Sequence, residues 1–150
     1  MNNKRLGIGF IGGGFITRFH IQSLLAVRDV DVIGVMSKTL KSAEESADLA
    51  NQIGVGDNAK AYKSITDMIA DPKINALRVC SPNFARIETF EEIANAISSG
   101  KGQLIGVTCE KPLGRNFNEA KRVLDLTKEV GLLDGYLENQ VFSPSIVRGK

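Results

Sequence analysis

Short apolar runs alternate with stretches of helical periodicity along this chain. The apolar runs have strand length and predict six strands, at Arg5–Ile11, Val30–Met36, Ala59–Tyr62, Ala76–Cys80, Gln103–Cys109 and Leu133–Leu137. The stretches between them predict five helices, near Phe15–Val27, Leu40–Ile53, Ile65–Ala70, Ala85–Ser98 and Phe117–Val130. This alternation is typical of a parallel sheet that carries helices on both faces.

The helix ends carry signals that agree with this division. Two N-terminal ends have a capping residue followed three positions later by an acid, in the pairs Ser64 with Asp67 and Asn116 with Glu119. Gly100 and Gly131 suit C-terminal ends, where glycine adopts a left-handed backbone at little cost. The sequence therefore predicts a doubly wound α/β fold of three layers, a Rossmann fold, with strand order 3-2-1-4-5-6.

A glycine-rich turn after the first strand is the main candidate for a ligand site. The pattern G-x-G-x-x-G fits literally from Gly7, but that register would open the helix with three glycines, each about 1 kcal/mol worse than alanine. The register Gly12-x-Gly14-x-x-Thr17 leaves a complete strand before the turn and starts the helix near Phe15. Backbone N–H groups at the positive end of that helix then face a pyrophosphate. A glycine turn without a ligand is the alternative.

The end of the second strand bears on which dinucleotide would bind. An Asp or Glu there would accept hydrogen bonds from the adenosine ribose and repel a 2′-phosphate. Here the strand runs into Ser37, Lys38 and Thr39, whereas Asp29 and Asp31 stand at its other end. Two hydroxyl donors and a cation suit the 2′-phosphate, which favours NADP over NAD. A plain helix cap at Ser37 or Thr39, with Lys38 in solvent, is the alternative.

Two further loops follow the fourth and fifth strands, at the edge of the sheet where open α/β folds bind ligands. The first is a rigid polar turn of Ser81, Pro82 and Asn83, in which Asn83 is a candidate helix cap. The second places Glu110 and Lys111 before a proline, directly after a nearly apolar strand. Such a lysine can bind a substrate oxygen or modulate a proton transfer, and a surface ion pair is the alternative.

Composition narrows the class of protein further. The 150 residues are 43% hydrophobic and 24% charged, which indicates one ordinary globular domain. The net charge of +2 is small and the basic residues are dispersed, which disfavours binding to nucleic acid or to an anionic membrane surface. No apolar run approaches the roughly 18 residues that span a membrane, and the N-terminal segment has no signal-peptide cleavage site.

Two cysteines and one histidine limit the possible metal and redox chemistry. Cys80 and Cys109 each end an apolar run, which indicates buried thiols in a reducing compartment and hence a cytoplasmic location. A redox pair on neighbouring strands is the alternative. One histidine and two cysteines are too few for a zinc cluster, so we expect no metal site.

Several of these segments resemble the glucose-fructose oxidoreductase, inositol dehydrogenase and MocA family of NAD(P)-dependent oxidoreductases. The resemblance rests on the glycine turn continued to His20, on the Ser-Pro-Asn turn, on the sequence Glu110-Lys111-Pro112 and on the late segment GYLENQVFSP at 135–144. It covers most of the chain. The combination of the Glu-Lys-Pro sequence with a correctly placed glycine turn is quite specific to the family.

The resemblance implies roles for individual residues. Lys111 corresponds to the family's active-site lysine, and the Lys111–Pro112 bond is expected to be cis. Asn83 and Glu110 are expected near the nicotinamide. The pyrophosphate is expected to contact four residues of the turn and the helix start, namely Gly12, Gly14, Phe15 and Ile16.

The chain also departs from the family pattern. Family members often carry an Asp where Ser37 stands, which again favours NADP, and often a His where Arg86 stands. Thr17 replaces the usual small residue of the turn. His20 matches a frequent family histidine, for which we expect a helix-packing role rather than catalysis.

Members of the family continue for roughly another domain beyond the segment matched here. Their catalytic Asp and His lie in that further part, so we expect residues 1–137 to form a dinucleotide-binding domain and residues 138–150 to lead into a substrate domain. Hydride transfer between the nicotinamide cofactor and a sugar or cyclitol hydroxyl would then require that domain, and we expect binding without useful turnover from these 150 residues. An expressed fragment, a truncated gene product and a stand-alone binding domain all fit this expectation.

Two other functions are alternatives. A non-catalytic nucleotide-sensing or protein-interaction module is the first, and a methyltransferase-like Rossmann domain, which leaves Lys111 unexplained, is the second. The tail carries Val141, Phe142 and Ile146, which lack packing partners without a following domain. We therefore expect a homodimer through this apolar surface.

Overall fold

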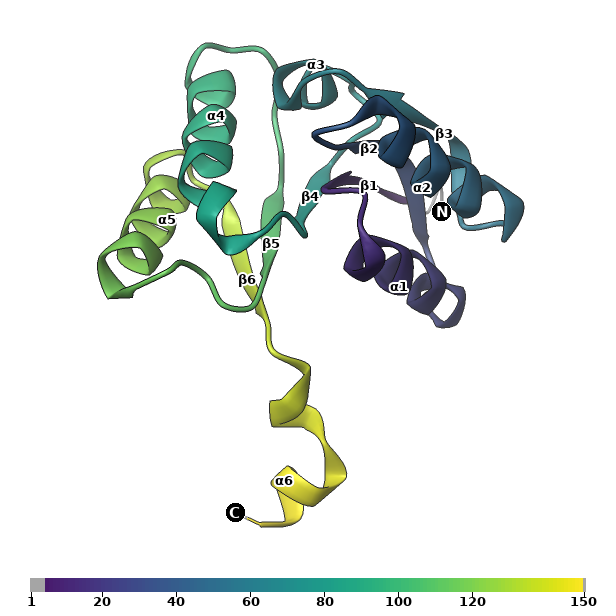
Figure 1. Ribbon diagram of the computed structural model, residues 1–150. Helices are drawn as coiled ribbons and strands as arrows, with labels where there is room; N and C mark the ends of the chain where they lie inside the picture. The colour runs from purple at the N-terminus through teal and green to yellow at the C-terminus, as the bar shows by residue number, and fades with distance from the viewer. Residues whose placement is uncertain (1–4, 150) are drawn as a thin grey trace.

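Parallel strands form one sheet in the order β3-β2-β1-β4-β5-β6 in the computed structural model, which describes residues 5–149. The six strands within this range are β1 (Leu6–Ile11), β2 (Val30–Met36), β3 (Gly56–Tyr62), β4 (Ala76–Val79), β5 (Gly106–Glu110) and β6 (Leu133–Leu137). Every neighbouring pair is parallel. From β1 the chain adds β2 and then β3 on one side, and it then crosses back to add β4, β5 and β6 on the other side of β1 (Figure 1). The strand order therefore changes direction between β1 and β4. The predicted Rossmann topology is confirmed.

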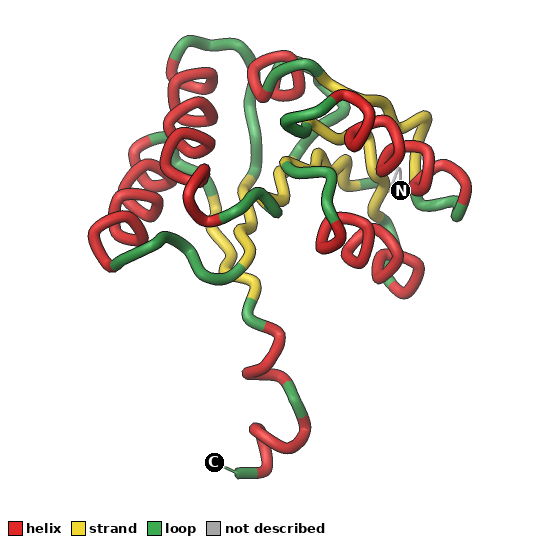
Figure 2. Tube along the Cα trace, in the orientation of Figure 1, coloured by secondary structure: helices red, strands yellow, loops and turns green. Residues whose placement is uncertain are grey.

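Helices connect the strands on both faces of the sheet (Figure 2). They are α1 (Phe15–Ser23), α2 (Leu40–Gln52), α3 (Ile65–Ile69), α4 (Arg86–Ser98) and α5 (Phe117–Glu129). A further helix, α6 (Pro144–Arg148), follows the last strand. Short 3₁₀ helices follow or precede three of these helices, at η1 (Leu24–Ala26), η2 (Asn83–Ala85) and η3 (Asn139–Phe142). The first predicted helix is thus divided into α1 and η1, while the other predicted helices are correct to within a residue at each end.

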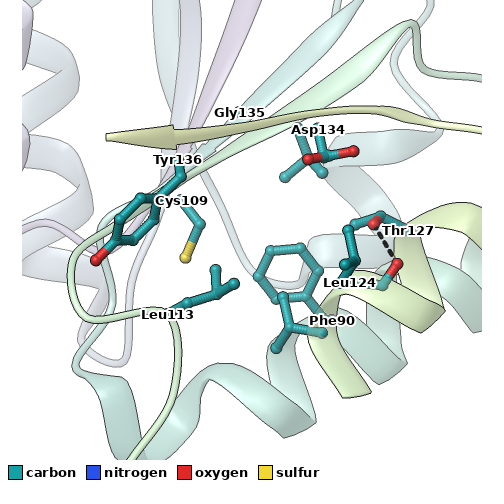
Figure 3. Close-up of a pocket in the computed structure, with 10 residues that line it drawn as sticks. Phe90, Cys109, Leu113, Leu124, Thr127, Asp134, Gly135 and Tyr136 are labelled. Atoms are coloured by element: carbon teal, nitrogen blue, oxygen red, sulfur yellow. Dashed lines mark hydrogen bonds between the residues drawn. The ribbon is translucent and has the colours of Figure 1, made fainter. Parts of the chain in front are cut away.

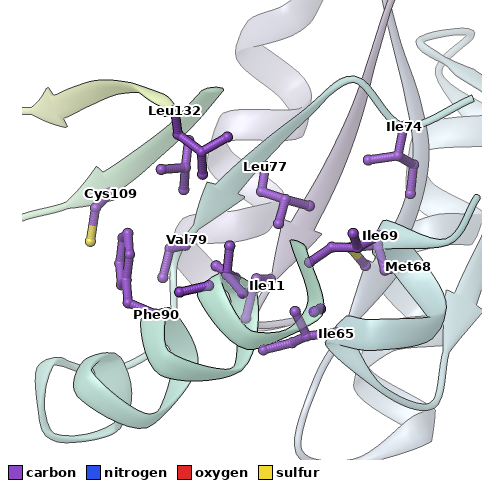
Figure 4. Packing of buried hydrophobic residues seen from close by; sticks show 14 of the residues in the cluster. Ile11, Ile65, Met68, Ile69, Ile74, Leu77, Val79, Phe90, Cys109 and Leu132 are labelled. Carbon is purple, nitrogen blue, oxygen red and sulfur yellow. The ribbon is translucent and has the colours of Figure 1, made fainter. Parts of the chain in front are cut away.

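Each face of the sheet has its own apolar core, because successive side chains of a strand point to opposite faces. On one face Phe10 of β1 is fully buried with Ile21 of α1 and the alanines of α2. On the other face Val79 of β4 packs against helices α3 to α5, together with Phe90 and Cys109 (Figure 4). These two cores fix the sheet, and with it the ends of its strands.

The two cysteines lie in different environments. Cys109 belongs to the core beneath α4, whereas Cys80 packs against the core beneath α1 and α2, on the opposite face of the sheet. Burial raises the pKa of the Cys80 thiol to about 12 and that of the Cys109 thiol to about 11. Both are free, protonated thiols at neutral pH, and their placement argues against a redox pair.

Strand β5 differs most from its predicted range. It begins at Gly106, where pairing with Leu133 of β6 starts, and it continues through Glu110. Glu110 is therefore the last residue of a strand and only 9% exposed, rather than the first residue of a loop. β3 also starts earlier than predicted because Gly56 pairs with β2. Cross-strand pairing sets these limits, and apolar content alone does not reveal it.

Both predicted N-terminal helix caps form their side-chain hydrogen bond. A side-chain oxygen accepts the N–H three residues later at 3.0 Å in both predicted pairs, Ser64 with Asp67 and Asn116 with Glu119. The carboxylate of Glu119 accepts the backbone N–H of Arg115 at 2.8 Å instead of that of its own capping residue. Gly100 and Gly131 end their helices with φ of +70° and +69°. The predicted helix ends are confirmed, except that the acid of the capping pair Asn116–Glu119 does not bond the backbone N–H of its capping residue.

The C-terminal tail extends away from the sheet (Figure 1). Its helices η3 and α6 contact each other, and Phe142 is 78% exposed while Val141, Ile146 and Val147 are about half exposed. Residues 1–4 and 150, at the outer limits of the two expected domain segments, lie outside the described residues. No helix of residues 5–149 has both the length and the apolar character to cross a membrane.

A hydrogen bond at the edge strand β3 should make the stability of the fold depend on pH. Tyr62 donates its hydroxyl to Asp71 at 2.6 Å, and this bond holds the pKa of Asp71 below its usual range. Tyr62→Phe should lower the free energy of unfolding by about 1.5 kcal/mol at pH 7, as expected for a hydrogen bond to a charged group. Because the folded pKa lies below the unfolded value of about 3.9, the contribution of Asp71 is complete above that value and is lost as pH falls through the folded pKa.

Urea unfolding at pH 7 and pH 3 measures this difference, which should shrink in acid. Tyr136→Phe is the matched control, because its ring is 51% exposed. A Tyr62→Phe effect of equal size at both pH values would contradict the assignment.

Candidate functional site

A cleft of about 900 Å³ lies at the carboxyl ends of β1, β2, β4 and β5. This is the edge of an open α/β sheet at which ligands bind, at the point where the strand order changes direction. The structure brings together there all of the site residues predicted from the sequence, Gly12, Gly14, Phe15, Ile16, Ser37, Lys38, Thr39, Ser81, Pro82, Asn83, Glu110 and Lys111.

The glycine turn (residues 12–14) leaves no room for side chains at its first two positions. Gly12 has φ of +105°, and a Cβ there would lie 3.0 Å from the backbone of Cys80. A Cβ on Gly13 would lie 2.5 Å from the carbonyl oxygen of Ser42 in α2. A Cβ on Gly14 would instead point into open space. The turn is therefore packed on the protein side and bare on the cleft side, where a ligand can approach the backbone.

Helix α1 opens onto the cleft without a cap. Gly14 is its N-cap residue, and no side chain of the described chain caps the helix or places an acid in its first turn. The first N–H groups of a helix have no intrahelical acceptor, and the helix dipole makes this end positive. Phe15, at the first helical position, is 79% exposed beside the cleft. This end of α1 can therefore bind an anion through its backbone.

Thr17 stabilises the glycine turn from the protein interior. It is 1% exposed, and its Oγ1 donates to the carbonyl oxygen of Gly12 at 2.6 Å. The sequence indicates only that Thr17 departs from the small residue of the pattern. The structure shows that its hydroxyl bonds the turn, so the larger residue is accommodated by a specific contact.

Two serines of α2 also contact the glycine turn, and the sequence analysis did not predict them. Ser46 is fully buried and donates to the carbonyl oxygen of Gly13 at 3.3 Å. Ser42 contacts Gly13 through its backbone and hydrogen-bonds Ser37 and Thr39 through its hydroxyl, at 2.9 and 2.8 Å. Their spacing of four residues, on the face that also carries Ala43 and Ala47, is the signal that could have found them.

The segment from Ser37 to Thr39 forms one wall of the cleft, at the carboxyl end of β2. Lys38 and Thr39 are exposed at the cleft, and Ser37 is partly buried. Thr39 occupies the N-cap position of α2, but its hydroxyl makes no cap bond and pairs with Ser42 instead. Asp31 lies at the far end of β2, where Arg5 binds it at 2.6 Å. A plain capping role therefore does not account for these hydroxyls.

The Ser-Pro-Asn turn (residues 81–83) lines the cleft beside the glycine turn, since a Cβ on Gly12 would lie 3.0 Å from the backbone nitrogen of Ser81. Asn83 is the first residue of η2, and α4 begins after Ala85 without a side-chain cap. The prediction that Asn83 caps a helix is wrong, because the 3₁₀ turn places α4 three residues further on. Ser81 is buried, and its hydroxyl has no hydrogen-bond partner within residues 5–149. Buried hydroxyls usually have partners, so the Ser81 hydroxyl is an exception among the described residues.

The Glu-Lys-Pro loop (residues 110–112) is anchored by a buried carboxylate. Oε1 of Glu110 contacts Nε2 of His20 at 2.6 Å, and Oε2 accepts the backbone N–H of Lys111 at 3.1 Å. The Lys111–Pro112 bond is cis, as the family resemblance implies. His20 thus does more than pack its helix: it links α1 to the end of β5. The side chain of Lys111 is exposed and lines the cleft.

A second pocket lies between α4, α5 and the last two strands (Figure 3), but it is too small to be the site. Its volume is about 30 Å³, which is about that of one water molecule. Phe90, Cys109 and Leu113 line it, so it is a gap in the apolar core. Within the described residues, no group of three or more His, Cys, Asp or Glu side chains could hold a metal ion.

Comparison with known proteins identifies the family. The model of the oxidoreductase family with an NAD-binding Rossmann fold, GFO/IDH/MocA, matches residues 6–135. The chain belongs to this family.

Individual relatives agree with this membership. The chain is 29% identical to 1,5-anhydro-D-fructose reductase of Ensifer adhaerens over 127 residues, which are 85% of this chain and 34% of that protein. It is 29% identical to myo-inositol 2-dehydrogenase of Thermotoga maritima over 126 residues, with 84% and 34% covered. The crystal structure of GenD2 from gentamicin A biosynthesis, in complex with NAD, superposes with a TM-score of 0.77 at 25% identity, covering 97% of this chain and 38% of that one. This member of the GFO/IDH/MocA family thus spans about a third of the length of these curated relatives.

The closure of the glycine turn can be tested at Thr17. Thr17→Val keeps the buried shape but removes the donor to Gly12, so the free energy of unfolding should fall by about 1 kcal/mol. Thr127→Val is the matched control, because Thr127 is also buried but bonds only Leu124 of its own helix. Urea unfolding followed by circular dichroism measures both variants. The absence of any loss from Thr17→Val would contradict the assigned role of Thr17.

Proposed function

We propose that the chain binds NADP(H) in this cleft, as the dinucleotide-binding part of an oxidoreductase that transfers hydride between nicotinamide and a sugar or cyclitol hydroxyl. The observation that carries the proposal is the bare backbone at Gly14 beside the uncapped end of α1. A pyrophosphate needs this combination of close approach and free N–H groups. The names of the relatives, a reductase and a dehydrogenase of sugar-like and cyclitol substrates, support the same reaction class.

Different residues would bind the two parts of the dinucleotide, the pyrophosphate and the nicotinamide. The backbone of the glycine turn with Phe15 and Ile16 would hold the pyrophosphate. The Ser-Pro-Asn turn, which contributes Ser81, Pro82 and Asn83, and Glu110 of the Glu-Lys-Pro loop would flank the nicotinamide. Lys111, exposed beside them, would bind the substrate oxygen and hold a proton there. The bound dinucleotide would supply the hydride.

NADP is proposed over NAD because of the wall at Ser37, Lys38 and Thr39. Two hydroxyls and an ammonium group face the cleft from the end of β2, and Ser42 orders both hydroxyls by hydrogen bonds. A carboxylate would favour a ribose hydroxyl, whereas this set of donors favours a phosphate.

Activity of a whole protein would need more than these residues. We propose that residues 1–137 are the dinucleotide-binding domain and that 138–150 lead toward a substrate domain, which corresponds to the further length of the relatives. Sugar specificity and the acid–base partners of Lys111 would belong to that domain. We therefore place cofactor binding, without useful turnover, in the 150 residues themselves.

The exposed tail supports a second function, as a protein-interaction module. The tail that carries α6 extends away from the sheet (Figure 1), and Phe142 of η3 is 78% exposed. We propose that the apolar residues of this tail mediate self-association of the chain.

The cofactor proposal is tested by titrating the protein with NADPH and NADH at one salt concentration. NADPH should bind more tightly, and Lys38→Ala should weaken NADPH binding about tenfold, or about 1.4 kcal/mol, while NADH binding changes little. Lys128→Ala, on the exposed surface of α5, removes the same charge far from the cleft and should change neither. Binding of neither dinucleotide would refute the proposed function. Tighter binding of NADH would refute only the preference for NADP.

Self-association is tested by sedimentation equilibrium. The double variant Phe142→Ser and Ile146→Ser should raise the dimer dissociation constant at least about tenfold. Phe117→Ser is the matched control, because Phe117 is equally exposed, at 78%, but lies on α5. A monomer at high concentration, or equal weakening by the control, would argue against an interface at the tail.

A further inference from the structure

Arg86, the first residue of α4, joins the two loops at the nicotinamide end of the cleft. Its Nε and Nη2 donate to the carbonyl oxygen of Ser81 at 3.3 and 3.2 Å. Nη2 also donates to the carbonyl oxygen of Lys111 at 3.3 Å. Nη2 thus bridges the Ser-Pro-Asn turn and the Glu-Lys-Pro loop, and Nε adds a second bond to Ser81 that a lysine ammonium group could not supply in the same planar arrangement.

Packing does not account for this arginine. Arg86 is 3% exposed, its Nη1 has no hydrogen-bond partner, and no carboxylate within residues 5–149 forms an ion pair with it. The Cys109 thiol lies nearby, but burial raises the pKa of that thiol to about 11, so it supplies no counter-charge at neutral pH. A buried charge that has only neutral partners reduces stability compared with an apolar side chain of similar size. The guanidinium is therefore better explained by the loops that it holds.

The backbone of Lys111 is held from both sides. Its N–H donates to Glu110, whose other carboxylate oxygen is fixed by His20, and its carbonyl oxygen accepts from Arg86. Both holding groups are buried, whereas the side chain of Lys111 is exposed to the cleft. This arrangement fixes where the lysine leaves the backbone and leaves its ammonium group free to meet a substrate.

We propose that Arg86 is a positioning residue for the nicotinamide end of the cleft. It holds the Ser-Pro-Asn turn and Lys111 at a fixed separation through its hydrogen bonds to their carbonyl oxygens. The proposal rests on the proposed function, that the cleft binds a nicotinamide dinucleotide. The hydrogen bonds of Arg86 go to Ser81 and Lys111, and none reaches the wall at Ser37, Lys38 and Thr39. Arg86 should therefore affect the nicotinamide half of the ligand and not the adenosine half.

The test compares a whole dinucleotide with its adenosine fragment. NADPH and 2′,5′-ADP, or NADH and ADP if NADH binds more tightly, are titrated into the wild type and into Arg86→Met, which keeps the length of the side chain without its donors. Arg86→Met should weaken dinucleotide binding about tenfold and leave fragment binding within about twofold. Arg86→Lys, which keeps the charge but loses the second donor to Ser81, should show a smaller loss with the same selectivity. Arg122→Met, on α5, is the control and should change neither affinity.

Two outcomes for a folded variant would overturn the proposal. Equal weakening of dinucleotide and fragment would mean that Arg86 supports the fold as a whole, and unchanged dinucleotide binding would mean that it positions nothing. If Arg86→Met does not fold, Arg86→Lys carries the same comparison. Wild-type protein that binds neither molecule would refute the proposed function itself, and this inference with it. Wild-type binding of the fragment without the dinucleotide would refute the nicotinamide-side assignment alone.

Discussion

The close packing of three backbones at the glycine turn is the constraint on which the rest of the site depends. The glycine turn at the end of β1 passes between the backbone of Cys80, which follows β4, and Ser42 of α2. A side chain at Gly12 would collide with Cys80, and a side chain at Gly13 would collide with Ser42. This contact brings the ends of β1, β2 and β4 together and aims the first turn of α1 at the cleft. Thr17 and Ser46 then hold the turn by hydrogen bonds to the carbonyl oxygens of Gly12 and Gly13.

A polar network extends this order to the other end of the cleft. His20 of α1 bonds Glu110 at the end of β5, Glu110 bonds the N–H of Lys111, and Arg86 bonds the carbonyl of the same residue. Helix α1 therefore supports the cleft at both ends, through its N-terminus at the glycine turn and through His20 one turn later. Buried polar groups that satisfy one another specify geometry closely, because any shift leaves a charge or an amide without its partner.

Much of the fold could be predicted from the sequence, for local reasons. Strand-length apolar runs, glycines after helices and capping residues act within a few positions, and they gave the strand order and the helix limits almost correctly. The candidate site could also be predicted as a set, since parallel strands bring their carboxyl ends to one edge. The range of β5 was wrong at both ends because pairing with β6, a partner 27 residues further along in the Gly106–Leu133 pair, decides it.

The sequence by itself determined the Rossmann topology, the glycine turn and the family, because each is written in residue type and short spacing. Only the tertiary structure decided what Thr17, His20 and Arg86 do, and that Asn83 caps no helix. The partners of these side chains lie on other elements, up to 90 positions away for His20 and Glu110. The chemistry of a histidine or arginine allows many partners, and which one it meets depends on the angle and depth at which helices pack on the sheet.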